Sequence, residues 1–516
     1  MTNLNDFLDL SARDLTDRYA SGELTPVEVT EAALARIDAY NSEVNAFVFL
    51  EGDENFSQEQ YRENALKEAK ESWERWKNGT PKGPLDGVPI TIKDLILTKG
   101  WATLRGSLTT SPGKPEDWDE EAPPVQRLRE SGAVFLGKTT TPEYGWKGVT
   151  DSPRTGITRN PWNPNLTSGG SSGGASVAAA LGMGTLHLSS DGGGSARLPG
   201  CFTGVVGFKP TFGRVPNYPS AHTGTLAHPS ITTRTVEDAA LMLNVISRPD
   251  SHARDWYALP EDKTDYLAQL DHEGEGGQPL AGLRIVYSST FTHNVYDEHG
   301  LFVREEDYKV DSEIQSKVDA AVKVLEELGA TVKRVNASDI NPALKKALEI
   351  YDTFWRVGAA KLVRSFTGDQ AFKVETGLIL TALLGQGISQ AEYMSAIDER
   401  EALGRGMEQL HKDYDLLITP TVPIKPFEVG NLYPPHSDLY APATNWTPFT
   451  YPFNLTQQPA ISVPCGFTND GLPVGMQIVG ARYQDLLVLQ VARAYEKVAP
   501  FVMPSGVKSV LPVALK

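Results

Sequence analysis

The chain has 516 residues, of which 40% are hydrophobic and 22% are charged. These fractions are typical of soluble globular proteins and exclude a disordered or fibrous chain. The net charge of −17 at neutral pH repels phosphate backbones and anionic lipid, so we expect neither nucleic acid nor a membrane as a partner.

The N-terminal 80 residues are expected to be helical. Residues 25–28, Thr-Pro-Val-Glu, form a capping box with proline at the first helical position. Apolar residues then recur four positions apart from Val29 to Ile37, which places them on one helix face. Residues 51–82 are polar and predict a surface helix followed by a loop.

Helix and strand signals alternate further along the chain. Residues 125–130 predict a helix that Gly132 ends, and residues 133–136 predict a buried strand. The same order returns with a helix at 314–328 and a strand at 331–335. Alternation of this kind indicates the α/β class.

Two shorter segments complete this outline. Residues 283–287 predict another strand, and residues 271–277, Asp-His-Glu-Gly-Glu-Gly-Gly, predict a surface loop or linker. We find no internal repeat and no coiled-coil heptads in the sequence.

The cysteine count and the N-terminus indicate a cytoplasmic location. Two cysteines, Cys201 and Cys465, cannot build a disulfide framework, which fits a reducing compartment. Residues 1–6 contain neither a basic segment nor an apolar run, so no signal peptide is expected. The longest weakly polar run, residues 173–188, is short for a membrane span.

Glycine is concentrated in two clusters that also contain serine, at residues 167–174 and 191–195. Glycine lets a ligand approach the main chain closely, and serines in such loops lie among exposed N–H groups. A nucleophile that generates an oxyanion needs this environment. The alternative is a pair of flexible surface loops. The small residues at 175–180 favour a closely packed helix after the first cluster instead.

Residues 132–139 match the P-loop pattern G-x-x-x-x-G-K-[ST]. That motif requires a strand before it, a loop through its variable positions and a helix after it. Here the variable positions are Ala-Val-Phe-Leu, which is the sequence of a strand, and Pro142 follows soon after. We therefore interpret the segment as a strand and its exit turn rather than as a phosphate site.

Other catalytic patterns are missing from the sequence. Nine histidines occur without an H-E-x-x-H motif or paired Cys-x-x-Cys motifs, so neither a metal nor another cofactor is expected. His222 and His228 are expected on the surface or in a substrate loop. A G-x-S-x-G elbow is also missing around Ser195, which disfavours a Ser-His-Asp hydrolase.

Lysine offers another base. Residues 87–94, Gly-Val-Pro-Ile-Thr-Ile-Lys-Asp, place Lys93 at the end of an apolar, β-branched run. Burial lowers the pKa of a lysine, and a neutral lysine is a competent general base. An ordinary ion pair of Lys93 with Asp94 or Glu143 is the alternative, and this stretch alone favours it.

Three separated motifs, at residues 87–94, 169–174 and 190–197, together resemble the amidase signature family. Flanking pieces of the resemblance lie at 204–211, 234–239 and 471–477. The resemblance covers residues 10–505 and implies one large α/β domain with a mixed central sheet covered by helices. We accordingly expect a helical region, residues 1–80, packed on a catalytic domain, residues 81–505, in one structural unit.

The family uses a Ser-cisSer-Lys triad. The resemblance implies that Ser195 is the nucleophile, that Ser171 follows a cis peptide bond and that Lys93 is the base. Lys93 would take a proton through Ser171, and Ser195 would form an acyl-enzyme. The backbone N–H groups implied for the oxyanion are those of Gly192, Gly193, Gly194 and Ser195.

Four neighbouring residues are expected to support these loops. Asp191 and Arg197 are expected to pair and hold the nucleophile loop. Ser172 and Thr167 are interpreted as loop supports outside the triad.

Sequence differences from other family members indicate the class of substrate. Residues 137–146 resemble free-standing amidases and lack the Asn-Met-Asp-Glu-Phe run of the glutaminase subunit of tRNA-dependent amidotransferase. Residues 446–454 are rich in aromatic side chains, which indicates an apolar or aromatic acyl or amine group. For any one of these aromatics, core packing is the alternative. The candidate substrate-binding residues are Tyr144, Trp146, Gly169, Gly170, Trp446 and Phe449.

The expected function is hydrolysis of a small-molecule amide to a carboxylic acid and an amine. A carbamate, hydrazide or ester hydrolase of the same mechanism is the first alternative. An amidotransferase glutaminase subunit, which needs a partner chain, is the second. We leave a homodimer open as the assembly.

Overall fold

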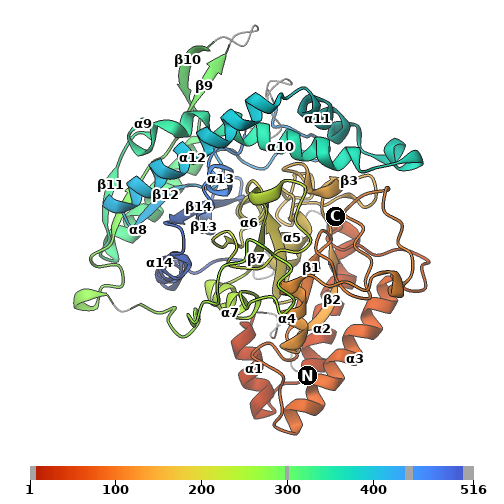
Figure 1. The fold of residues 1–516 in the computed structure, drawn as a ribbon. Helices are drawn as coiled ribbons and strands as arrows, with labels where there is room; N and C mark the ends of the chain where they lie inside the picture. The colour runs from red at the N-terminus through yellow and green to blue at the C-terminus, as the bar shows by residue number, and fades with distance from the viewer. Residues whose placement is uncertain (1–6, 8, 273, 297–301, 436–445, 504–516) are drawn as a thin grey trace.

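The structure is a computed structural model that describes residues 7, 9–272, 274–296, 302–435 and 446–503. Its central element is a ten-stranded sheet (Figure 1). The strands of this sheet are β1 (Pro89–Lys93), β2 (Val134–Thr139), β5 (Leu186–Asp191), β6 (Val206–Lys209), β7 (His228–Thr233), β8 (Arg284–Tyr287), β11 (Thr331–Arg334), β12 (Leu416–Pro420), β13 (Ala460–Phe467) and β14 (Pro473–Gly480).

The sheet is mixed. Its strand order is β11-β8-β12-β14-β13-β6-β7-β5-β1-β2. The pairs at both ends, including β1 with β2 and β8 with β11, are parallel, whereas β12 to β14 and the central pairs are antiparallel. Two short sheets lie outside it, β3 (Asp151–Ser152) with β4 (Gly156–Ile157) and β9 (Thr292–Tyr296) with β10 (Phe302–Asp307).

Helices surround the sheet. They are α1 (Ala12–Ser21), α2 (Pro26–Val44), α3 (Gln58–Lys77), α4 (Pro123–Glu130), α5 (Gly173–Ala180), α6 (Arg197–Thr203), α7 (Val236–Ile246), α8 (Ser312–Glu327), α9 (Ala337–Ile340), α10 (Ala347–Arg364), α11 (Thr376–Gln386), α12 (Gln390–Asp413), α13 (Pro452–Leu455) and α14 (Asp485–Val498). Among the described residues, no helix combines the length and apolar character that crossing a bilayer requires.

Both faces of the sheet are buried. Successive side chains of a strand point to opposite faces. In β12, Leu416 and Ile418 belong to one hydrophobic cluster, and Leu417 between them belongs to another. In β2, Phe135 and its neighbour Leu136 divide between two clusters in the same way. The architecture is therefore the α/β fold with a helix-covered mixed sheet that we expected.

The predicted elements are present with small shifts at their ends. The Thr25 side chain accepts from the Glu28 N–H and the Glu28 carboxylate accepts from the Thr25 N–H, which confirms the capping box of α2. The predicted helices at 125–130 and 314–328 correspond to α4 and α8, and the predicted strands at 283–287 and 331–335 correspond to β8 and β11.

The N-terminal helices α1, α2 and α3 lie together at one end of the molecule (Figure 1). The Ala12 N–H donates to the Asp238 carboxylate at 2.7 Å, which joins the start of α1 to α7. At the other end of this region, Arg75 of α3 forms an ion pair with the buried Asp86 at 2.6 Å. These contacts fix the helical region on the remainder of the chain.

The segment with the P-loop pattern lies in β2, as interpreted from its sequence. Lys138 is buried and donates to the Thr98 and Thr103 hydroxyls and to the Ile96 carbonyl. Lys138 therefore binds oxygen atoms of the adjacent loop after β1.

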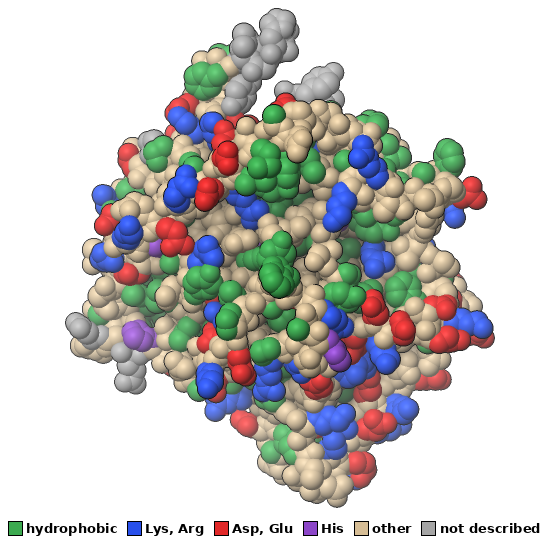
Figure 2. All heavy atoms as spheres, in the orientation of Figure 1, with side chains coloured by type: hydrophobic (Ala, Val, Ile, Leu, Met, Phe, Trp, Pro, Cys, Tyr) green, Lys and Arg blue, Asp and Glu red, His purple; other side chains and the backbone are tan. Residues whose placement is uncertain are grey.

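The outer surface carries charges of both signs. Figure 2 shows Lys and Arg side chains interspersed with Asp and Glu on the visible face. Residues 271–277, predicted as a loop or linker, lie on the surface between α7 and β8, and Glu273 within them is outside the described residues. Residues 1–6, considered above for a signal peptide, are also outside the described residues.

Gly174 in α5 provides a test of the packing around the glycine clusters. A Cβ atom at this position would lie 2.4 Å from the Thr140 amide nitrogen and 2.6 Å from the Ala46 carbonyl oxygen. Because backbone atoms cannot rotate away, we expect Gly174→Ala to destabilise the fold by about 1–3 kcal/mol. Thermal unfolding of the purified variant measures this loss.

Gly404→Ala is the matched control in α12. No atom lies within 4 Å of the Cβ position of Gly404, and alanine has the higher helix propensity. Its unfolding midpoint should equal or exceed that of the wild type. A wild-type midpoint for Gly174→Ala would contradict the close packing of α5.

Candidate active site

Lys93 ends β1, and its amine is buried among three serine hydroxyls. The Nζ atom lies 2.7 Å from the Oγ atom of Ser171, 2.8 Å from that of Ser172 and 3.1 Å from that of Ser190. The side chain is completely buried. Burial lowers the pKa of Lys93 well below its ordinary value, and the negative charge of Asp191 only partly opposes this shift.

The ion pairs considered for Lys93 from the sequence are not formed. The Asp94 carboxylate accepts from the backbone N–H groups of Leu104 and Gly106. The Glu143 carboxylate accepts from the Ser107 hydroxyl at 2.5 Å and from the backbone N–H of Glu375. Both carboxylates are satisfied elsewhere, and among the described residues the hydrogen-bond partners of the Lys93 amine are three hydroxyl groups.

Ser171 lies in the turn that leads into α5. The peptide bond between Gly170 and Ser171 is cis, as the resemblance implies. A Cβ atom at Gly170 would lie 2.7 Å from the Val149 carbonyl carbon, and one at Gly173 would lie 2.4 Å from the Thr150 hydroxyl. Glycine is therefore needed at both positions because neighbouring chain segments press directly on the turn.

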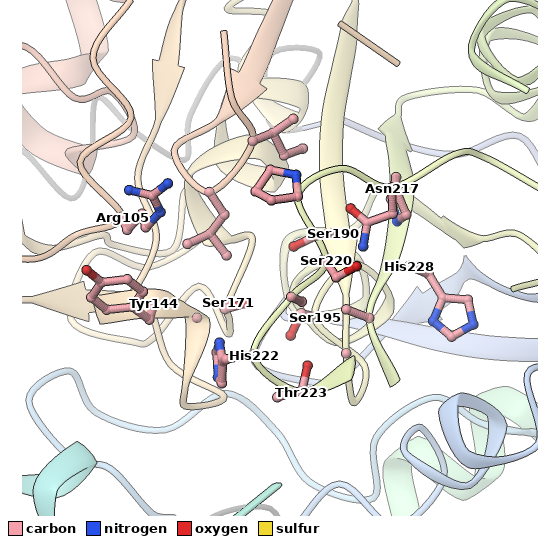
Figure 3. Close-up of a pocket in the computed structure, with 18 of the residues that line it drawn as sticks. Arg105, Tyr144, Ser171, Ser190, Ser195, Asn217, Ser220, His222, Thr223 and His228 are labelled. Carbon is pink, nitrogen blue, oxygen red and sulfur yellow. The ribbon is translucent and has the colours of Figure 1, made fainter. Parts of the chain in front are cut away.

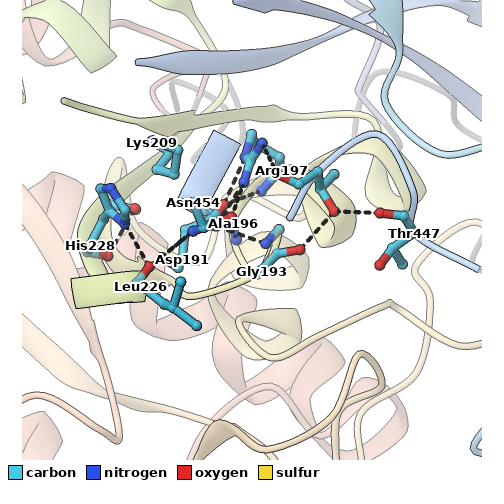
Figure 4. Close-up of polar contacts among 12 residues, drawn as sticks. Asp191, Gly193, Ala196, Arg197, Lys209, Leu226, His228, Thr447 and Asn454 are labelled. Carbon is cyan, nitrogen blue, oxygen red and sulfur yellow. Dashed lines mark hydrogen bonds and ion pairs between the residues drawn. The ribbon is translucent and has the colours of Figure 1, made fainter. Parts of the chain in front are cut away.

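Ser195 lies between β5 and α6, in a loop fixed by a buried ion pair (Figure 4). The Arg197 guanidinium contacts both carboxylate oxygens of Asp191 at 2.9 Å, and neither side chain is exposed to solvent. Burial alone raises the pKa of Asp191, but the charge and hydrogen bonds of Arg197 outweigh it and hold this pKa well below its ordinary value. The predicted pairing of Asp191 with Arg197 is confirmed.

Distant segments complete this network. Asn454 of α13 donates to the Asp191 carboxylate at 2.9 Å and accepts from Arg197 at 2.7 Å. Arg197 also donates to the Gln477 side chain of β14 and to the Thr450 carbonyl. The Thr450 hydroxyl in turn donates to the Gly193 carbonyl at 2.7 Å. The network thus connects the serine loop to the C-terminal third of the chain.

One of the N–H groups expected at the oxyanion is already engaged. The Gly194 N–H donates to the Asp191 carboxylate at 2.8 Å, so in this conformation it holds the loop instead of facing a ligand. In the described part of the chain, no acceptor contacts the N–H groups of Gly192, Gly193 or Ser195. Of the four N–H groups implied by the resemblance, those of Gly192, Gly193 and Ser195 are therefore available in this conformation.

Ser171 and Ser195 line the same cavity, of about 320 Å³ (Figure 3). Its wall is largely apolar and includes Leu95, Ile96, Tyr144, Pro219, Trp355 and Leu362. A second, narrow recess of about 20 Å³ also borders Ser195 and is lined by Trp146, Gly170, Gly193, Gly194 and Tyr351, among others. The two spaces thus share three lining residues, Gly145, Ser195 and Trp355.

The structure divides the predicted substrate-binding residues into two groups. Tyr144 lines the cavity, and Trp146 and Gly170 line the recess. Trp446 instead stacks on Phe202, with ring centroids 6.1 Å apart.

Phe449 and Gly169 also lie away from both spaces. Phe449 packs on Phe291, with ring centroids 5.0 Å apart, and is completely buried. A Cβ atom at Gly169 would lie 2.4 Å from the Leu198 side chain. The aromatic-rich segment at 446–454 therefore serves core packing at these positions, which is the alternative left open by the sequence.

Both histidines singled out in the sequence line the cavity rather than the outer surface. Burial and the nearby charge of Lys361 lower the pKa of His222 to about 4. Burial, with a further contribution from the charge of Lys209, lowers the pKa of His228 well below its ordinary value. Both imidazoles are therefore uncharged at neutral pH.

Sequence reasoning missed several residues of the site. Ser190 contacts Lys93, and Ser172, interpreted as a loop support, contacts it as well. Both lie inside motifs quoted for the resemblance, so their position could have been noticed. Arg105 and Trp355 line the cavity from segments without any motif. Among the described residues, no cluster of three or more His, Cys, Asp or Glu side chains is arranged to hold a metal ion.

The comparisons with known proteins agree on one family. The Amidase family model matches residues 28–489. An acylamidase from Rhodococcus erythropolis is 35% identical over 509 residues, covering 95% of this chain and 96% of that protein. The structure of a bacterial aryl acylamidase of the amidase signature family is similar with a TM-score of 0.82 at 28% identity, covering 96% of this chain and 98% of that one. The chain belongs to the amidase signature family.

A second kind of relative is nearly as similar. A glutamyl-tRNA(Gln) amidotransferase subunit from Halothermothrix orenii is 34% identical over 515 residues, covering 95% of this chain and 98% of that protein. Membership of the family therefore supports amide chemistry without deciding between the two groups.

The buried ion pair of the serine loop generates a prediction. Arg197→Met leaves the Asp191 carboxylate buried without its counter-charge, which should lower the free energy of unfolding by about 3–5 kcal/mol. Urea unfolding measures this loss. Arg405→Met is the control, because Arg405 pairs with Glu401 on the surface with side chains 67% and 71% exposed. This variant should change stability by less than about 0.5 kcal/mol, and equal losses in both variants would refute the assigned role of Arg197.

Proposed function

We propose that this protein is a serine hydrolase of amide C–N bonds that acts through Lys93, Ser171 and Ser195. The observation that carries the proposal is the 2.7 Å contact between the buried Lys93 amine and the Ser171 hydroxyl. A lysine with a lowered pKa and no carboxylate partner is suited to accept a proton at neutral pH.

Hydrogen-bond counting supports Ser171 as the relay. A neutral amine has two N–H donors and one lone pair, so one of the three surrounding hydroxyls must donate to it. Ser172 already donates its hydroxyl proton to the Ser190 carbonyl at 3.0 Å. The donor to Lys93 is therefore Ser171 or Ser190, both of which line the cavity with Ser195. We propose Ser171, because its turn is joined to the Ser195 loop by the hydrogen bond from the Ser172 N–H to the Ser195 carbonyl at 3.0 Å.

The proposed reaction proceeds through an acyl-enzyme. The Ser171 hydroxyl passes its proton to Lys93 and takes the proton of Ser195, whose oxygen attacks the substrate carbonyl. Ser171 then gives a proton to the leaving nitrogen as the C–N bond breaks and takes one back from Lys93. Water attacks the acyl carbonyl carbon, its proton passes through Ser171 to Lys93, and the proton returns by the same path to Ser195 as the acid leaves. In the described structure the two serine hydroxyls share no hydrogen bond, a contact that commonly tightens only when substrate is bound.

The N–H groups of Gly192, Gly193 and Ser195 are proposed to stabilise the oxyanion. They are the donors near Ser195 that the loop network leaves available. One well-directed donor contributes about 3–4 kcal/mol to the stability of such a transition state.

We propose a small apolar or aromatic amide as the substrate. The cavity of about 320 Å³ suits a small molecule, and its apolar wall with Tyr144 and Trp355 suits an aromatic or alkyl group. The similarity to an acylamidase and to an aryl acylamidase supports the same class. Carbamates, hydrazides and esters could react by the same steps.

An amidotransferase subunit is the second candidate, because one is 34% identical over nearly the whole chain. The experiment that separates the two is an assay of the purified chain alone. Hydrolysis of acyl anilides without added protein or tRNA supports the free-standing amidase. Glutamine hydrolysis that appears only with a partner chain supports the amidotransferase.

Ser195→Ala should reduce amide hydrolysis at least about 1,000-fold, because the nucleophilic oxygen is lost. A fluorophosphonate reagent should label the Ser195 peptide of the wild type, as measured by peptide mass, and leave the variant unlabelled. Ser176→Ala is the control, since this hydroxyl is buried in α5 without a hydrogen-bond partner and outside the cavity. Full activity in Ser195→Ala would exclude the proposed nucleophile.

Lys93→Met tests the charge state of the amine. In the wild type, kcat/KM should rise with pH through the lowered pKa of Lys93 and level off well below pH 10.5, because only the uncharged amine accepts a proton. The variant should be inactive at every pH.

The pH dependence of protein stability reports independently on the charge of the Lys93 amine. Between the lowered pKa of the buried Lys93 and 10.5, the unfolded wild type binds a proton that the folded state does not, so its stability rises with pH over this window. Lys93→Met lacks this contribution. Urea unfolding from pH 7 to 10 should therefore show a steeper rise for the wild type, and identical slopes would mean that Lys93 is charged when buried.

A further inference from the structure

The cavity at Ser195 has a charge opposite to that of the whole chain. The chain carries a net charge of −17. The charged residues that line the cavity are Arg105 and Lys361, and within the described structure no aspartate or glutamate lines it. His222 and His228 are uncharged at neutral pH because burial lowers their pKa values. A ligand in this cavity therefore meets two positive charges and no negative one.

Arg105 has most of its hydrogen-bonding capacity unused. A guanidinium group has five N–H donors, and the one side-chain hydrogen bond of Arg105 goes to the Thr103 carbonyl at 3.2 Å. Arg105 forms no ion pair among the described residues. The nearby Asp94 carboxylate accepts from the N–H groups of Leu104 and Gly106 instead.

The backbone holds Arg105 in an unusual conformation. Its φ angle is +57°, and that of Tyr144, its neighbour on the cavity wall, is +51°. The Tyr144 N–H donates to the Arg105 carbonyl at 2.8 Å. Non-glycine residues seldom adopt this left-handed region, and those that do are concentrated at ligand sites. Two such residues, bonded to each other, direct their side chains to one wall of the cavity (Figure 3).

Lys361 lies near the end of α10 and is exposed where the cavity meets the surface. It forms no ion pair within the described structure, and its charge contributes to the lowered pKa of His222. Two carboxylates bind lining residues from outside the cavity. Glu120, on the exposed surface, accepts from the Tyr218 hydroxyl, and Asp255 accepts from the Asn217 backbone N–H. A cation at the mouth raises the local concentration of anions near an otherwise acidic protein.

We infer that Arg105 anchors a carboxylate-binding subsite in this cavity, with Lys361 attracting the anion at its mouth, so that the proposed amide with its aromatic or alkyl group also carries a carboxylate. This inference rests on the proposed function and names its substrate class. Arginine suits the role because its planar fork binds a carboxylate through two parallel hydrogen bonds.

Two matched pairs of amides test the inference. Glutaryl-4-nitroanilide and pentanoyl-4-nitroanilide differ only in a terminal carboxylate on the acyl side. 4-Acetamidobenzoate and 4-methylacetanilide differ in the same way on the amine side. The wild type should prefer the anionic member of at least one pair in kcat/KM, and the pair concerned identifies the side of the scissile bond that faces Arg105.

Substitutions assign the preference to its residue. Arg105→Gln should lower kcat/KM for the preferred anionic amide about 10- to 100-fold, mainly through KM, and leave its neutral partner unchanged. For the anionic amide, the kcat/KM of Arg105→Lys should lie between that of the wild type and that of Arg105→Gln. Lys361→Gln should cause a smaller loss that disappears at high ionic strength. Arg364→Gln, which removes a positive charge from the same helix outside the cavity, should change neither member.

A binding measurement avoids dependence on turnover. Glutarate or benzoate should slow fluorophosphonate labelling of Ser195 in the wild type and not in Arg105→Gln. The inference is overturned if the wild type prefers the neutral member of both pairs, if Arg105→Gln affects both members equally, or if neither carboxylate slows labelling. Loss of the proposed function would differ from all of these, because Ser195 would then remain unlabelled and neutral amides unhydrolysed.

Discussion

The contact on which the candidate site depends is the buried pair of Asp191 and Arg197. Asp191 is the carboxylate whose charge reaches Lys93 and raises its pKa. Arg197 binds both oxygens of that carboxylate, and desolvation outweighs the effect of the Asp191 charge on the lysine. The same pair fixes the loop of Ser195. This ion pair thus fixes the nucleophile loop, whereas burial sets the protonation of the proposed base.

The sheet supplies the positions between which this chemistry is arranged. β1 ends at Lys93, and its neighbour β5 ends at Asp191, so two parallel strands deliver the amine and the start of the serine loop to the same edge. The turn before α5 brings Ser171 between them. Residues far apart in sequence therefore meet because strand ends meet, and glycines at 170, 173 and 174 let the connecting segments approach closely.

Much of this could be predicted from the sequence, because the signals were local. A capping box at Thr25 and a glycine stop at Gly132 depend only on neighbouring residues, and the three motifs each place their lysine or serine within a few positions. The sequence could not show that one predicted oxyanion donor, the Gly194 N–H, binds Asp191, since this contact is a matter of loop geometry. Trp446 and Phe449 show the limit of composition, because an aromatic cluster has the same sequence whether it lines a cavity or fills a core. The position of Arg105 at the cavity could not be predicted, since it depends on a loop conformation that no sequence pattern indicates.

The small recess beside Ser195 has a consequence for the order of events in turnover. Its volume of about 20 Å³ is large enough for a water molecule. Ser171, the proposed proton relay, lines the large cavity and not the recess. On the proposed mechanism, a water molecule that attacks the acyl carbonyl carbon must therefore enter from the cavity, where the amine lies, so that hydrolysis of the acyl-enzyme follows departure of the amine.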